Sequence, residues 1–142
     1  MSELEEQIKQ IFEVYRTTVS AKDVNAFTAL YDENIHVFDM WGKWSYDGIQ
    51  AWRGMVTEWF GSLGNEKVGV DFSDMQIEAA SDMSIAHAIV TYRGLSAEGK
   101  ELRSMQNRLT LGLKNKNGMW KIIHEHSSAP IAPETLKAIL QK

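Results

Sequence analysis

Residues 118–130 read Gly-Met-Trp-Lys-Ile-Ile-His-Glu-His-Ser-Ser-Ala-Pro, and they are the most informative segment of this 142-residue chain. The dipeptide 117–118, Asn-Gly, is a hairpin turn signal, so residues 119–127 are predicted to form the last strand of an antiparallel hairpin. The apolar period changes around Ile122 and Ile123, which predicts a β-bulge there. Because a bulge reverses the faces of the strand beyond it, the sequence leaves open which of the later side chains point inward.

Upstream of this strand, the apolar period is strand-like after residue 65 and helical before it. Four further strands are predicted, over residues 68–72, 75–80, 84–95 and 101–114. Three helices are predicted to begin at Ser2, Asp23 and Asp47, and the first and third carry capping-box spacing to Glu5 and Gln50. A strand over residues 35–39 and a short tail helix from Glu134 to Leu140 complete the set.

This order of elements predicts an α+β fold in which the helices cover one face of a strongly bent antiparallel sheet. A sheet wrapped around three N-terminal helices leaves room for an internal pocket. The chain length and the lack of a Pro/Gly/Ser-rich linker predict a single domain over residues 1–142.

The composition excludes several functional classes. The chain has no cysteine, so a thiolate nucleophile, a thiolate metal ligand and a disulfide are all excluded. Its net charge of −4 does not favour nucleic acid as a partner. The acidic N-terminus does not resemble a signal peptide, and no apolar run approaches the roughly 18 residues of a membrane span. We therefore expect a cytoplasmic protein without a membrane partner.

The pattern Gly118-x-Trp120-Lys-Ile-Ile-His-Glu-His-x-Ser128-x-Pro130 resembles the end of domains in the nuclear-transport-factor-2-like superfamily. The superfamily includes ketosteroid isomerase-like and SnoaL-like enzymes, and the motif is similar to the association domain of calmodulin-dependent protein kinase II. The resemblance extends from about Leu4 to Pro130. It implies a cone-shaped α+β barrel with an internal pocket, assembled as a homodimer or a larger oligomer.

Tyr15 and Asp39 have a spacing similar to that of the catalytic pair of ketosteroid isomerase. The resemblance implies that Asp39 is the base that moves a proton and that Tyr15 donates a hydrogen bond to the oxyanion. The second oxyanion donor of that family is a carboxylic acid on a late strand. Residues 105–111 carry no carboxylate, and Asn107 is the hydrogen-bonding residue there. The alternative is that Tyr15 belongs to a core stripe and Asp39 ends a strand.

An aromatic cluster follows the strand that ends at Asp39. Four of the five tryptophans fall within 20 residues, which favours an apolar pocket for a flat hydrophobic ligand. Core packing is the alternative for each member. The candidate ligand-binding residues of this cluster are Trp41, Trp44, Tyr46, Trp52, Met55 and Trp59.

Arg103 and Asn107 share the predicted inner face of the strand at 101–114, and Arg93 lies on the neighbouring strand. An arginine that points inward needs an anionic partner, so an anionic ligand is one option. Surface or edge positions for both arginines are the other option.

His124 and His126 project to one side of a regular strand and are candidate ligand-binding residues. A metal site is not expected, because Glu125 points the other way and no third ligand lies nearby in the sequence. A structural role near a subunit contact is the alternative for the histidines. Because SnoaL-like enzymes carry an acid in this region, the resemblance makes Glu125 a weaker acid–base candidate.

These observations predict a domain that binds a small hydrophobic molecule and needs no cofactor. If the protein is an enzyme, we expect an isomerase, cyclase or dehydratase that acts by general acid–base proton transfer; the sequence leaves open whether it is one. The alternative is a non-catalytic oligomerisation or association module. We expect no second domain to be assembled, and this expectation favours the ligand-binding interpretation.

Overall fold

The computed structural model describes residues 2–142. It contains three helices, α1 (Glu3–Ala21), α2 (Val24–Thr28) and α3 (Ile49–Ser62). It also contains six strands: β1 (Tyr31–Phe38), β2 (Tyr46–Asp47), β3 (Lys67–Ala79), β4 (Met83–Leu95), β5 (Glu101–Lys116) and β6 (Met119–Ser128).

Local sequence signals explain where α1 begins and which face it buries. The Ser2 hydroxyl oxygen accepts a hydrogen bond from the Glu5 amide at 3.1 Å, as the predicted capping box requires. The apolar stripe then turns one face toward the sheet, and its fully buried members include Ile8 and Val19.

Helix α3 begins one residue later than the sequence predicts. Its N-cap is Gly48, which adopts φ +88°, and no side chain caps it. Asp47 does not cap the helix, because it lies in β2 and its carboxylate contacts the His36 ring at 2.5 Å.

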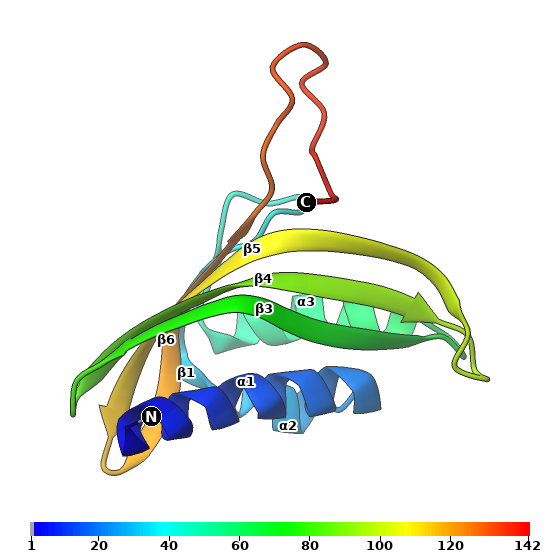
Figure 1. Ribbon diagram of the computed structural model, residues 1–142. Helices are drawn as coiled ribbons and strands as arrows, with labels where there is room; N and C mark the ends of the chain where they lie inside the picture. The colour runs from blue at the N-terminus through cyan, green and yellow to red at the C-terminus, as the bar shows by residue number, and fades with distance from the viewer. Residues whose placement is uncertain (1) are drawn as a thin grey trace.

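The sheet has the order β2-β1-β6-β5-β4-β3 and is strongly bent. All neighbouring pairs are antiparallel except β1 and β6, which are parallel, so the sheet is mixed and does not close. Figure 1 shows β3, β4 and β5 arching over α1 and α3, which cover the concave face. This is the predicted α+β arrangement, except that the sheet was predicted to be antiparallel and the β1–β6 pair is parallel.

Two of the predicted strands are one continuous strand. The prediction divided residues 68–80 in two, whereas β3 runs without interruption and its register against β4 shifts between Ser73 and Gln76. Asp74 adopts φ +53° at this irregularity. The irregularity bends the strand without ending it, which a pattern of apolar residues does not distinguish from a turn.

The predicted tail helix at 134–140 does not form. The tail makes an isolated bridge between Ile131 and Ala138, and Leu136 has φ +61°. Leu136 is 78% exposed, so a helix here has no apolar surface to pack against. The tail instead returns to the sheet, where the Gln106 amide donates to the Leu140 carbonyl at 2.7 Å, and Figure 1 shows this excursion from β6 back toward β5.

The predicted bulge in β6 is confirmed. Ile122 pairs with Leu113 and His124 pairs with Gly112, so Ile123 is an extra residue in the ladder. Before the bulge, Trp120 and Ile122 are buried; after it, the buried side chains are those of Glu125 and Ser127. The bulge therefore decides which residues of the motif face the helices.

No helix in the described part of the chain is both long and apolar enough to cross a membrane.

Candidate functional site

A cavity of about 480 Å³ lies between the helices and the concave face of the sheet. Its size is typical of sites that bind small molecules. The lining residues come from α1, α3, the segment after β1, and strands β2 to β6: Tyr15, Asp39, Trp41, Tyr46, Trp52, Met55, Trp59, Leu63, Val68, Tyr92, Arg93, Gly94, Arg103, Ser104, Met105, Asn107, Glu125 and Ser127.

The structure brings most of the sequence-predicted site residues to this one cavity. Ten of them are among its lining residues: Tyr15, Asp39, Trp41, Tyr46, Trp52, Met55, Trp59, Arg93, Arg103 and Asn107. Trp44, His124 and His126 are not, contrary to the expectation that they contact a ligand. Trp44 lies in the irregular loop before β2 and is 95% exposed. It does not share a face with Tyr46, two positions later, because side chains alternate regularly only in an extended strand.

His124 and His126 lie on the outer face of the sheet. The bulge at Ile123 turns Glu125 inward, and the two histidines consequently point outward. There they pack on Phe38 with ring-centroid distances of 5.1 and 5.6 Å. The His124 ring nitrogen Nδ1 also lies 2.8 Å from the His36 carbonyl oxygen.

Glu125 is a buried carboxyl group inside the cavity, with only 2% of its surface exposed. The Tyr31 hydroxyl donates a hydrogen bond to its Oε1 atom at 2.5 Å. Burial raises the pKa of Glu125 to about 8, and the Tyr31 hydrogen bond opposes only part of that rise. Glu125 is therefore mainly protonated at neutral pH and can donate a proton.

Asp39 is the second carboxyl group of the cavity, and its environment is more polar. Its Oδ1 accepts a hydrogen bond from the Ser127 hydroxyl at 3.1 Å, and its Oδ2 accepts one from the Trp41 amide at 3.3 Å. Burial raises the pKa of Asp39, and these hydrogen bonds to the charged form oppose the rise. The two carboxyl groups thus have unequal proton affinities, as a general acid and a general base require.

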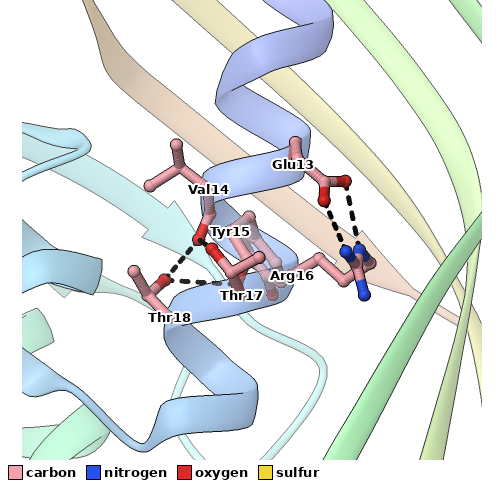
Figure 2. Close-up of polar contacts among 6 residues, drawn as sticks. All are labelled: Glu13, Val14, Tyr15, Arg16, Thr17 and Thr18. Carbon is pink, nitrogen blue, oxygen red and sulfur yellow. Dashed lines mark hydrogen bonds and ion pairs between the residues drawn. The ribbon is translucent and has the colours of Figure 1, made fainter.

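Tyr15 joins the site from α1. Its hydroxyl lies 2.8 Å from the Tyr92 hydroxyl on β4, and burial raises the pKa of both phenols, so both are neutral donors. Figure 2 shows the turn that carries Tyr15, where the Thr18 hydroxyl donates to the Val14 carbonyl at 2.6 Å. In this pair one hydroxyl donates to the other, and the accepting hydroxyl keeps its proton for a ligand.

Both arginines have carboxylate partners. Arg93 follows the inward-facing Tyr92 on β4, and its Nη2 atom binds Asp71 at 2.8 Å. Arg103 is on the inner face of β5, as predicted, and its Nη2 binds Glu66 at 2.5 Å. Their charges are therefore already paired.

Three buried side-chain atoms have no hydrogen-bond partner within residues 2–142: Trp52 Nε1, Arg93 Nε and Asn107 Oδ1. Two of the three belong to cavity-lining side chains that are almost fully buried, since Trp52 is 2% and Asn107 is 7% exposed. Buried polar atoms without partners are rare in proteins, and those of Trp52 and Asn107 belong to residues in the walls of the cavity.

Sequence reasoning missed Tyr31 and Tyr92 as site residues. Tyr31 follows a short helix and reads as a core aromatic, and its contact with Glu125 joins positions 94 residues apart. Tyr92 alternates with apolar residues on β4 and carries the strand signal of a core residue. The alternation of side chains along β4 could have identified Tyr92, because residues two apart share a face and Val90 is buried.

In the part of the chain that the structure describes, no group of three His, Asp or Glu side chains has a metal-binding arrangement.

The bent sheet, the helices on its concave face and the mainly apolar cavity between them define a class of α+β proteins with the cystatin-like, NTF2-like fold. The SnoaL-like domain model matches residues 8–132, and the chain belongs to this family. The superfamily predicted from the 118–130 motif is therefore confirmed.

Solved structures agree with this assignment. An NTF2-like protein of unknown function from Pseudomonas putida is 27% identical, with a TM-score of 0.85 over 97% of this chain and 94% of that one. Aln2 from a Streptomyces species is 17% identical, with a TM-score of 0.79 over 90% of this chain and 91% of that one.

A protein from Xanthomonas campestris, provisionally named a calcium/calmodulin-dependent protein kinase II association domain, has a similar fold. It is 17% identical, with a TM-score of 0.77 over 95% of this chain and 91% of that one. No curated protein matches the sequence.

Proposed function

We propose that this protein binds a small hydrophobic carbonyl compound in its cavity and moves a proton on it without a cofactor. The observation that carries the proposal is the pair of carboxyl groups with unequal environments, Asp39 and Glu125, in one mainly apolar cavity. Such pairs divide the roles of base and acid between two residues of the same type. The expected class is an isomerase or a lyase.

Asp39 is the base of the proposed reaction. Its carboxylate takes a proton from the carbon next to the ligand carbonyl, and the electron pair of the broken C–H bond moves to form an enol or enolate. Return of that proton to another carbon gives isomerisation, whereas loss of a group from the next carbon gives elimination. Ser127 and the Trp41 amide hold the carboxylate in place.

The carbonyl oxygen gains negative charge in this step and needs neutral donors. The Tyr15–Tyr92 pair has one free hydroxyl proton, and protonated Glu125 has another. Fixed donors in a mainly apolar cavity stabilise an oxyanion more than water does. Residues 105–111 carry no carboxylic acid that could serve as the second oxyanion donor. In the proposed reaction, Glu125 on β6 takes that role.

The test is proton exchange on 2-tetralone, a bicyclic ketone with acidic hydrogens next to its carbonyl. We expect the protein to accelerate deuterium uptake from D₂O above the buffer rate, as followed by proton NMR. Replacing the base, D39N, lowers that acceleration by roughly 100-fold or more, while calorimetric affinity for 2-tetralone changes little.

D47N is the matched control, because Asp47 is an exposed aspartate on β2 that binds His36 outside the cavity. It should exchange protons at the wild-type rate. Equal acceleration by D39N and wild type would refute Asp39 as the base. Binding without any acceleration would favour the non-catalytic association module.

We further propose that two copies of the chain associate through the outer face of the sheet. The helices cover the concave face, whereas the outer face of β1 and β4 presents three large apolar side chains. Phe38, Met83 and Ile85 are 40%, 47% and 52% exposed there. Burial of such side chains against a second copy favours a dimer.

A further inference from the structure

We propose that Trp52 and Asn107 are the two polar anchors of the cavity and that they select a neutral ligand with both a carbonyl and a hydroxyl group. The Trp52 indole N–H is a further donor to the carbonyl oxygen, beside the Tyr15–Tyr92 pair and Glu125, and the Asn107 side-chain oxygen accepts from the hydroxyl. This inference rests on the proposed function and narrows its ligand class.

Trp52 provides the donor on the helical wall. It projects from α3, packs against the rings of Tyr31 and Tyr46 at 5.8 and 5.5 Å, and is 2% exposed. Its Nε1 atom nevertheless has no hydrogen-bond partner among residues 2–142. A buried N–H without a partner costs about 1–3 kcal/mol, and a phenylalanine would fill similar space without that cost. A ligand oxygen restores the missing hydrogen bond.

Asn107 provides the acceptor on the sheet wall. It faces the cavity from β5 and is 7% exposed, between positions where β5 otherwise buries leucines such as Leu109 and Leu111. Its Nδ2 donates at 3.4 Å to the Met40 sulfur, a weak acceptor, and its Oδ1 has no partner in the described residues. A leucine here would continue the apolar stripe, so the amide is better explained by a ligand hydroxyl than by packing.

The charge distribution favours a neutral ligand. Two carboxyl groups, Asp39 and Glu125, line the cavity. The cationic residues among the described lining are Arg93 and Arg103, whose guanidinium groups bind Asp71 and Glu66. An anionic ligand would approach a carboxylate without a free cation to balance it, which disfavours the anionic option left open by the sequence.

Three bicyclic probes separate the two anchors: tetralin, 2-tetralone and 6-hydroxy-2-tetralone. Calorimetry on the wild-type chain should show a gain of about fivefold or more in affinity for each added polar group, since each satisfies a buried atom. W52F should reduce the gain from the carbonyl while leaving the gain from the hydroxyl, and N107L should remove the gain from the hydroxyl while leaving the gain from the carbonyl. The affinity of each variant for tetralin is the reference from which its two gains are measured.

The matched controls are W44F and N65L, which make similar changes at exposed positions. They should retain the wild-type order of affinities. W52F is tested by the change from tetralin to 2-tetralone, and N107L by the change from 2-tetralone to 6-hydroxy-2-tetralone. Either variant therefore tests the inference if the other fails to fold. N107L should also unfold at a denaturant concentration no lower than that of wild type, because it removes an unpaired buried polar atom.

Three outcomes are decisive. Both gains in wild type and their separate loss in the two variants support the inference. Equal binding of all three probes, or gains that survive in W52F and N107L, overturns it, while deuterium exchange on 2-tetralone still tests the proposed function on its own. Failure of all three probes to bind overturns the inference, and deuterium exchange with the D39N and D47N variants then decides the proposed function separately.

Discussion

At the scale of the residue, burial in the cavity changes the pKa of the Glu125 carboxyl group. Its pKa is about 8 in the folded protein, against an ordinary value of 4.5. Between these two values the folded state holds a proton that the unfolded state has released. Stability therefore falls as the pH rises through this window and levels off above about pH 8.

The variant E125Q tests this dependence. Wild type should lose a few kcal/mol of unfolding free energy between about pH 5 and about pH 8, measured by urea titration at each pH. E125Q should lose much less, keeping only the part due to Asp39, whose pKa is raised in the same direction. E98Q, in the exposed loop before β5, is the control and should follow wild type. If the unfolding free energies of wild type and E125Q changed equally with pH, the raised pKa of Glu125 would be contradicted.

At the scale of the element, β6 shows what the sequence could and could not predict. The Asn-Gly turn, the strand and its bulge were all readable from residues 117–127, because turn chemistry and apolar period are local signals. The faces were not, since a shift of one position at Ile123 exchanges His124 and His126 for Glu125 and Ser127. The tail was predicted wrongly for the opposite reason: its helical pattern is local, but its partner on β5 is distant.

Deletion of Ile123 tests whether this residue is the extra one in the ladder. Its removal leaves Ile122 opposite Leu113 and His124 opposite Gly112, so the strand becomes regular and Glu125 still faces the helices. We expect a loss of only about 1–2 kcal/mol in unfolding free energy, measured in urea near neutral pH, because the bulge and one half-buried side chain are all that is lost. Insertion of one alanine between His124 and Glu125 should cost several kcal/mol instead, because it moves the Glu125 carboxyl group to the outer face. Similar losses in both variants would mean that the bulge does not set the faces of β6.

At the scale of the whole molecule, the two faces of the sheet have different tasks. The concave face meets the helices and builds the cavity, and the aromatic residues that predicted a pocket from sequence mostly lie there. The convex face carries Phe38 with the histidine rings, and Ile85 on β4. Because strands alternate their side chains, one sequence specifies both surfaces, and a substitution on one face can leave the other intact.

Ile85 is the position that tests self-association through the convex face. Its side chain is 52% exposed in the single chain, and a lysine there would place a charge in the proposed contact. Sedimentation velocity at micromolar concentration should show a dimer for wild type and a monomer for I85K, because an unpaired charge at an apolar interface is costly. L136K makes the same change at a 78% exposed tail residue and should remain dimeric. A monomeric wild type would refute the dimer but would leave the cavity chemistry untouched, since Asp39, Glu125 and both anchors belong to one chain.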